Sequence, residues 1–171
     1  SGSMSSADKL GLVQSSLKQL IAELQDGDSV SIVAYAGSAG LVLAPTPMSR
    51  KADIQEAIDR LQSGGSTAMG LGIQLAYAQA QDSFREGAVN RVLICSDGDA
   101  NVGATNHTEL SRLVQNRARN GITRTTLGFG NGNYNDTTME QLANDGDVNY
   151  FYVDSEKEAR RIFVDKWTGT L

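Results

Sequence analysis

The sequence contains little of what several common protein functions need. Its 171 residues include one cysteine, Cys95, one histidine, His107, and two prolines. A single cysteine excludes an internal disulfide, and Cys95 ends an apolar run in which a buried thiol is the simplest interpretation. His107 lies among polar residues. A serine or cysteine hydrolase would need a base partner, and one histidine in such a setting gives that chemistry little support.

Positive charge and long apolar runs are also scarce. Fifteen Lys and Arg residues stand against 20 Asp and Glu residues, and the net charge of −5 gives a nucleic-acid partner no electrostatic support. No apolar run approaches the roughly 18 residues that a membrane span needs, and the sequence shows no signal-peptide pattern. The composition, 40% hydrophobic and 20% charged, is ordinary for a globular protein. The length fits a single domain with a substantial core.

Helix and strand patterns alternate along the whole chain. This alternation predicts a three-layer α/β domain with a mainly parallel sheet. Helical spacing of apolar residues, alternation of apolar and polar residues, and capping or turn residues set the expected boundaries. The expected elements in the first half are a helix at about 6–25, a strand at 29–36, a turn at 37–40, a short strand at 41–43 closed by Pro45 and Pro47, a helix from a capping Ser49 to about 61, and a helix at 69–84. The second half is expected to contain a strand at 91–96, a helix at 106–120, a strand at 123–129, a glycine-rich loop at 128–135 and a short helix from Thr137. A strand at 149–153 and a helix capped by Ser155 with Glu158, which ends near Trp167, complete the prediction.

Three polar segments arrive at the carboxyl edge of this expected sheet. They are Ser1-Gly2-Ser3 before the first helix, Gly65-Ser66-Thr67 before the third, and Ser96-Asp97-Gly98 after the most apolar strand. Ligands of open parallel sheets gather at this edge. The segments offer the hydroxyls of Ser1, Ser3 and Thr67 and the carboxylate of Asp97. Oxygen ligands with little charge suit a hard cation such as Mg²⁺, so we expect a magnesium or manganese site there.

Simpler interpretations compete at each of these positions. Thr67 can cap the helix that follows it, and Asp97 can belong to a plain turn. A calcium loop beginning at Asp97 is excluded because its sixth and twelfth positions hold Val102 and Thr108 instead of glycine and glutamate. The glycine spacing at 128–132 resembles a phosphate-binding loop only weakly, because no lysine or full fingerprint accompanies it.

The three segments, in this order and with these elements between them, resemble the metal ion-dependent adhesion site of a von Willebrand factor A domain. The resemblance covers nearly the whole chain. Within the family, the sequence is similar to a bacterial subgroup of surface or membrane-associated proteins. That subgroup suggests a bacterial cell envelope or surface location. The segments that carry the likeness beyond the site are Ser29–Gly37, Ala44–Pro47, Gly64–Tyr77, Asn90–Gly103 and Leu127–Asp136.

The resemblance implies a Rossmann-like sheet of order 3-2-1-4-5-6 with one antiparallel edge strand. It implies that Ser1, Ser3, Thr67 and Asp97 hold a divalent metal. The same resemblance implies that an Asp or Glu of a protein partner completes the coordination shell of that metal. It also implies that the last helix, from about Ser155, shifts with ligand occupancy. No catalytic residue follows from it.

The chain departs from the family pattern at its start. The aspartate of the first metal loop and the central strand that would carry it are both absent from the sequence. Loss of a central strand exposes the edges of both neighbours. Three explanations stay open: a domain truncated before Ser1 within a longer protein, a strand supplied by another segment or by exchange with a second copy, or a cloning remnant at residues 1–3 that imitates the motif.

Two functions follow as leading hypotheses. The first is a non-enzymatic, metal-dependent protein-binding module, for which we expect weak or no metal binding by this chain because a carboxylate is missing. The second is a metal-free scaffold that binds partners through its surface. A hydrolase or phosphatase that uses Asp97 and Asp99 has neither a general base nor basic phosphate-binding residues nearby.

Overall fold

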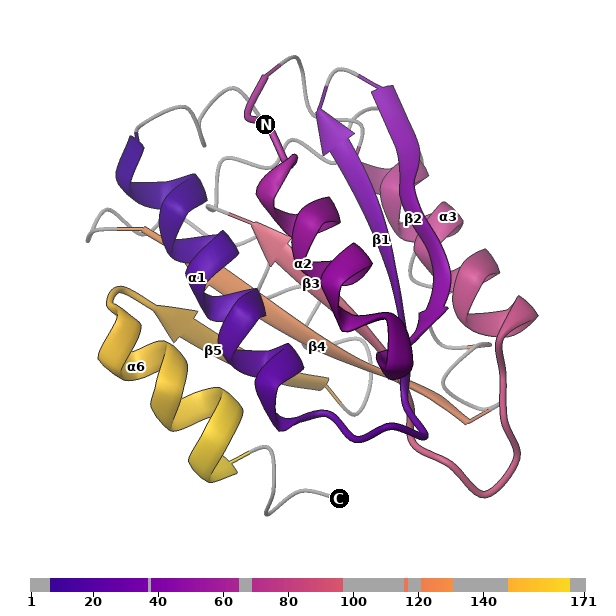
Figure 1. Ribbon diagram of the computed structural model, residues 1–171. Helices are drawn as coiled ribbons and strands as arrows, with labels where there is room; N and C mark the ends of the chain where they lie inside the picture. Colours follow the sequence, from indigo (N-terminus) through magenta and orange to yellow (C-terminus); the bar gives the residue numbers. More distant parts are fainter. Residues whose placement is uncertain are drawn as a thin grey trace.

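Helices and strands alternate in the structure much as the sequence predicts (Figure 1). The computed structural model describes residues 7–36, 38–64, 69–96, 116, 121–130 and 148–166. The elements are α1 (Ala7–Glu23), β1 (Ser29–Ala36), β2 (Ser38–Pro47), the 3-10 turn η2 (Met48–Arg50), α2 (Lys51–Asp59), α3 (Met69–Asp82), β3 (Asn90–Ser96), β4 (Ile122–Phe129), β5 (Val148–Val153), α6 (Glu156–Arg160) and the π-helical turn η3 (Arg161–Lys166).

The strands form two separate groups. β1 and β2 make an antiparallel pair, whereas β3, β4 and β5 make a parallel sheet with β4 in the middle. No strand of the described residues lies between β1 and β3, which is where the resemblance places the central strand. The α/β architecture with one antiparallel edge strand is confirmed, and the described strands form two groups with a break between β1 and β3.

The helices cover both faces of these strands. α1, α2 and α6 lie on one face, and α3 lies on the other (Figure 1). Because helices cover both faces, successive side chains of β3 pack alternately on one face and the other. Val92 and Ile94 pack in the cluster of α3, whereas Leu93 and Cys95 pack against the cluster that joins α1 to α6. The apolar strand is therefore covered on two sides, as expected of a strand inside a three-layer domain.

The short strand predicted at 41–43 is wrong in length. β2 extends to Pro47, which lies opposite Ser29, and Thr46 lies opposite Val30. A proline cannot donate to a ladder, but it is tolerated on an edge strand whose other side has no strand neighbour. Among the described strands β2 pairs only with β1, so Pro45 stands inside the strand, whereas Pro47 is its last residue.

The predicted helix cap at Ser49 is also wrong. Ser49 lies inside η2, and Arg50, which precedes α2, makes no side-chain capping bond. The main-chain N–H of Met48, where the turn begins, donates instead to the carbonyl of Asp28 at 2.9 Å. The carbonyl of Asp28, twenty residues away in the sequence, thus accepts the N–H at the start of the turn in place of a local cap. The helical spacing of Ile54, Ala57, Ile58 and Leu61 predicts a buried stripe on this helix. The first three are buried, whereas Leu61 lies beyond the end of α2 and is half-buried.

The cap at Ser155 is confirmed. Its hydroxyl accepts a hydrogen bond from the main-chain N–H of Glu158 at 3.3 Å. The helix is α-helical only to Arg160 and then widens into η3. The helix predicted at 106–120 lies outside the described residues except for Asn116, which is helical, and the helix predicted from Thr137 lies wholly outside them.

Within the described part of the chain, no helix has both the length and the apolar character that a membrane span requires.

Candidate metal centre

The structure brings the ends of three elements to one end of the molecule. The start of α1, the start of α3 and the end of β3 all lie at the end toward which β1 and β3 point (Figure 1). Parallel strands followed by returning helices produce this arrangement, because each helix begins where a strand ends. The segments 1–6, 65–68 and 97–100 are attached at these three places.

The four predicted metal ligands are themselves outside the described residues. Ser1, Ser3, Thr67 and Asp97 all fall in segments that the structure does not describe, so their coordination stays a prediction. The described neighbours fix where each segment is attached: Ser96 is the last residue of β3 and Met69 the first of α3.

β3 holds its end firmly in the core. Ser96 is buried and lies opposite Gly128 of β4, and the pairing between the two strands is regular over the whole of β3. Met69 at the start of α3 is also fully buried. Ser96, next to Asp97, and Met69, two residues after Thr67, are therefore anchored, which is a requirement for any site that needs defined ligand positions.

A close approach between α3 and β1 was not anticipated from the sequence. A Cβ atom at Gly72, in the first turn of α3, would lie only 2.9 Å from the Cβ of Tyr35. Glycine here lets the helix backbone touch the strand's side chain. This contact fixes the start of α3 against the end of β1. The sequence does carry a signal for this contact: two glycines, Gly70 and Gly72, stand in the first turn of a helix, where larger residues are usually favoured.

Tyr35 makes a second contact at the same edge. Its hydroxyl donates a hydrogen bond to the main-chain carbonyl of Cys95 at 2.5 Å. The two residues are sixty positions apart, and no local pattern in the sequence indicates that they meet. The bond links the end of β1 with the end of β3, two residues before Asp97 in the sequence.

Burial of the Cys95 side chain raises the pKa of its thiol to about 12. The thiol stays protonated at neutral pH, and a protonated thiol is a poor metal ligand and a poor nucleophile. The prediction of a buried, inert cysteine is consistent with this environment. It removes Cys95 from the candidate ligands.

The loop predicted to start at Gly128 begins two residues later. Gly128 and Phe129 belong to β4, and Gly130 has a φ of 148°. The Tyr152 hydroxyl donates to the carbonyl of Gly130, and the N–H of Gly130 donates to the carbonyl of Val153 at 3.4 Å. These contacts tie the start of this loop to β5.

The donor chemistry fits a hard cation. Three hydroxyls and one carboxylate are oxygen donors of the kind that Mg²⁺ and Mn²⁺ accept. No cluster of three or more His, Cys, Asp or Glu residues occurs among the residues that the structure describes. The three attached segments stay the place where a site is expected.

Comparison with known proteins gives consistent results. The family model described as the von Willebrand factor type A domain matches residues 1–164. An uncharacterized protein of Escherichia coli K12, YfbK, is 43% identical over 162 residues, which are 95% of this chain and 28% of that protein. The chain therefore spans well under half of that relative.

Two solved structures show the same fold. A von Willebrand factor type A protein from Catenulispora acidiphila superposes with a TM-score of 0.76 at 21% identity, covering 97% of this chain and 39% of that one. Proximal thread matrix protein 1 from the mussel byssus, with a zinc-occupied MIDAS motif, superposes with a TM-score of 0.67 at 23% identity, covering 91% of this chain and 39% of that one.

Proposed function

Because the chain belongs to the von Willebrand factor type A family, we propose that it is a non-enzymatic protein-binding module whose binding depends on a divalent metal. The observation that carries this proposal is the meeting of three segment ends at one edge of the fold (Figure 1). These are the segments that contain Ser1, Ser3, Thr67 and Asp97. The zinc-occupied motif named for the mussel protein supports a metal site in a protein of this fold.

Each residue has a proposed role. The hydroxyls of Ser1, Ser3 and Thr67 contribute neutral oxygen ligands, and Asp97 holds the ion directly or through a water molecule. Bound there, Mg²⁺ or Mn²⁺ supplies an electrophilic centre, and an Asp or Glu of the partner completes its shell. A site with few carboxylates of its own leaves the cation with enough net charge to attract that acidic group.

Calorimetric titration with MgCl₂ and MnCl₂ tests the metal part. The protein to use is a longer polypeptide that includes the natural residues before residue 1 and an aspartate there. We expect saturable heat from this protein and little or none from the 171-residue chain. Asp97→Ala in the longer polypeptide should remove the heat, whereas Asp154→Ala, a change of an exposed carboxylate, should not. Absence of saturable heat from the unmodified longer polypeptide would sink the proposal.

A metal-free scaffold is the second candidate. It is favoured by one observation: residues 1–6, which lead into α1, contain no carboxylate. Binding of a partner that survives EDTA and Asp97→Ala would support this function and contradict the metal-dependent one. Loss of binding under both treatments would exclude the scaffold.

A further inference from the structure

The side chain of Gln14, on α1, holds the end of α2. Its Nε2 atom lies 3.0 Å from the main-chain carbonyl oxygen of Ile58, 3.4 Å from that of Asp59 and 3.3 Å from that of Leu61. Three acceptors around one atom require the amide nitrogen there, because the amide oxygen cannot donate. The partners are 44 to 47 positions apart in the sequence, so this contact links two helices.

α2 ends without a local cap. Arg60, which follows it, has right-handed dihedral angles, and the last turn of α2 contains no basic side chain. None of the described residues at 60–64 has a positive φ, so a glycine-type cap is absent from this stretch. The last carbonyls of a helix need donors from elsewhere. Gln14 supplies such a donor, and the path of the chain after α2 therefore depends on α1.

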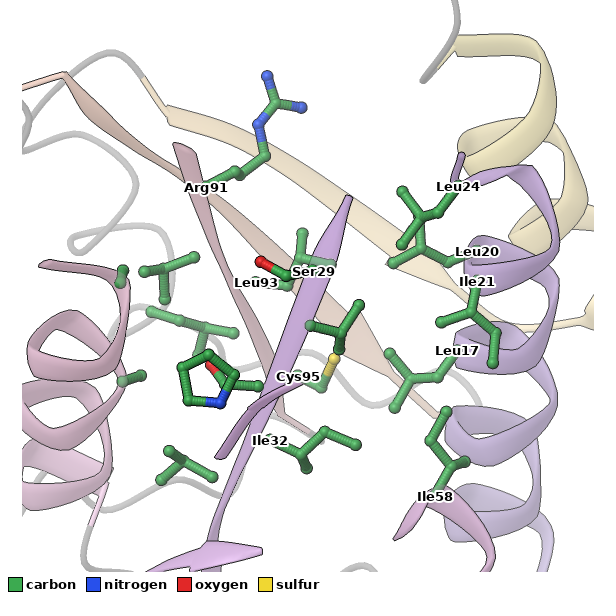
Figure 2. Close-up of a pocket in the computed structure, with 18 of the residues that line it drawn as sticks. Leu17, Leu20, Ile21, Leu24, Ser29, Ile32, Ile58, Arg91, Leu93 and Cys95 are labelled. Atoms are coloured by element: carbon green, nitrogen blue, oxygen red, sulfur yellow. The ribbon is translucent and has the colours of Figure 1, made fainter. Parts of the chain in front are cut away.

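The inner faces of the two helices place Gln14 in this position. Leu17 and Ile21 follow Gln14 on the same face of α1 at helical spacing. Both pack in one apolar cluster with Ile58 of α2. In Figure 2 the side chain of Ile58 lies next to that of Leu17. Gln14 is the polar end of this apolar contact.

A second polar contact between the same helices is weaker. Lys18, one turn after Gln14, forms an ion pair with Asp59 at 2.5 Å. The two side chains are 41% and 57% exposed, and ion pairs with such exposure contribute little to stability. Gln14 is half-buried and bonds to the main chain. It is thus the contact that fixes where the chain leaves α2.

The link lies close to two of the three segments of the candidate metal centre. α2 ends at the same end of the molecule as the start of α1 (Figure 1). Gln14 is two helical turns, about 10 Å, from the start of α1, to which segment 1–6 is attached. Residues 60–68 connect α2 to α3 and include Thr67. α1 therefore carries one segment at its start and, through Gln14, holds the beginning of the connection that contains another.

We propose that Gln14 is a positioning residue of the metal site. It fixes residues 60–64 against α1 and thereby sets where Thr67 stands relative to the segment that carries Ser1 and Ser3. This role rests on the proposed metal-dependent function and deepens it. Gln14 contacts neither the metal nor the partner, and it acts only through the main chain after α2.

A positioning role differs from a merely structural one because coupling is reciprocal. If the link raises the affinity for the metal by some factor, the bound metal must stabilise the link by the same factor. The N–H groups of Arg60 and Leu61 donate to the carbonyls of Glu56 and Ile58 at 3.1 and 3.2 Å, in the turn that Gln14 holds. Their hydrogen exchange therefore reports on the link. A merely structural bond would not respond to metal.

Three variants separate these roles. Gln14→Met keeps the length and the helix preference of the side chain and removes its donors. Gln14→Lys restores a donor, and its charge suits the carbonyl end of a helix. Ser15→Ala is the matched control. Ser15 is the next residue of α1, and its hydroxyl donates to Glu156 of α6 at 2.9 Å, so this change removes a contact between helices that does not involve α2.

The first measurement is amide hydrogen exchange of the 171-residue chain without metal. Gln14→Met should speed exchange at Arg60 and Leu61 roughly five- to tenfold, the effect of losing one hydrogen bond on a local opening equilibrium. Residues 125–127 of β4 serve as the internal reference and should not change. Gln14→Lys and Ser15→Ala should match the unmodified chain at both positions. Unchanged exchange in Gln14→Met would overturn the link and the proposal.

The second measurement uses MgCl₂ and the longer polypeptide of the calorimetric titration. Gln14→Met should weaken Mg²⁺ binding about tenfold, at the low end of what residues that orient metal ligands contribute. Gln14→Lys should restore the affinity, and Ser15→Ala should leave it unchanged. Saturating Mg²⁺ should slow exchange at Arg60 and Leu61 in the unmodified protein by the same factor.

The outcomes separate this role from the function on which it rests. Equal Mg²⁺ affinity with and without Gln14→Met would overturn the positioning role, as would an equal loss in Gln14→Lys or exchange at Arg60 and Leu61 that ignores Mg²⁺. Absence of saturable heat from the unmodified longer polypeptide would overturn the metal-dependent function and this role together. Saturable heat with an affinity that Gln14→Met does not change would overturn this role alone.

Discussion

β4 and β1 are strands of equal length that differ in how deeply their side chains are buried. In β4 every residue from Arg124 to Phe129 is buried, although three of the first five residues after Ile122 are threonines and another is an arginine. In β1 the apolar residues from Ile32 to Ala34 are only half-buried. The more polar strand is thus the more buried one. β4 has a strand on each side, and β1 has one neighbour among the described strands.

This contrast shows that lateral pairing, and not apolar composition alone, decides how deeply a strand of this domain is buried. Thr125 and Thr126 are carried inside because β3 and β5 enclose them. The aliphatic side chains of β1 keep solvent-accessible area because one flank has no strand neighbour among the described residues. Each of the following predictions compares the two sides of the domain, from the largest expected effect to the smallest.

Truncation of a core side chain should cost more in β4 than in β1. Leu127 of β4 is fully buried, whereas Ile32 of β1 is half-buried. Leu127→Ala should lower the free energy of unfolding by about 2–5 kcal/mol, and Ile32→Ala by less than about 2 kcal/mol. Urea unfolding followed by circular dichroism measures both. Equal losses would mean that the two strands share one environment in solution.

Filling the contact between α3 and β1 should destabilise the domain. The added methyl group of Gly72→Ala meets the Cβ of Tyr35 at 2.9 Å. Overpacking costs about 1–3 kcal/mol, partly offset by the gain of about 1 kcal/mol from replacing glycine in a helix. We expect a net loss in the same urea experiment.

Gly11→Ala in α1 is the matched control for Gly72→Ala, because an added Cβ there meets nothing within 4 Å. It should stabilise the domain by about 0.5–1 kcal/mol through helix propensity alone. Stabilisation by both changes would show that the helix and the strand are farther apart than in the structure.

High pH should weaken the domain through Cys95. Burial raises the pKa of its thiol to about 12, while the unfolded chain releases the proton near pH 8.5. The stabilising contribution is complete below about pH 8.5 and is lost as the pH rises toward 12. Over that window the free energy of unfolding falls by up to about 1.4 kcal/mol per pH unit. Urea unfolding at pH 7 to 10, compared with Cys95→Ala, isolates this slope; parallel curves would contradict a buried thiol.

Removal of the link between β1 and β3 should have a small effect. Tyr35→Phe keeps the ring and removes the hydroxyl that donates to the Cys95 carbonyl. We expect a loss of about 0.5–1.5 kcal/mol in the 171-residue chain. Urea unfolding followed by circular dichroism measures the loss, and an unchanged free energy of unfolding would contradict this hydrogen bond.

Local sequence patterns predicted the elements well, because their causes are local. The stripe of Val13, Leu20 and Ile21 on α1 is buried as its helical spacing indicates. The capping pair of Ser155 and Glu158 forms as expected. Both features depend on residues within one or two turns of each other.

Features that depend on distant partners could not be predicted in the same way. The cap at Ser49 failed because Met48 finds the Asp28 carbonyl, and the extent of β2 depends on its position at the sheet edge. Tyr35, Gly72 and Cys95 converge only in the folded chain. Ser1, Ser3, Thr67 and Asp97 are still known by their sequence pattern alone.

The prolines of β2 have a consequence for how the molecule behaves at high concentration. An open strand edge invites the same edge of another molecule, which is a common start of aggregation. Pro45 and Pro47 remove two donors from β2, the outer edge of its pair. Self-association through the outer edge of β2 is therefore discouraged. Among the described strands, the open edges that remain are the inner edges of β1 and β3 and the outer edge of β5, so self-association at high concentration is expected to begin at one of these.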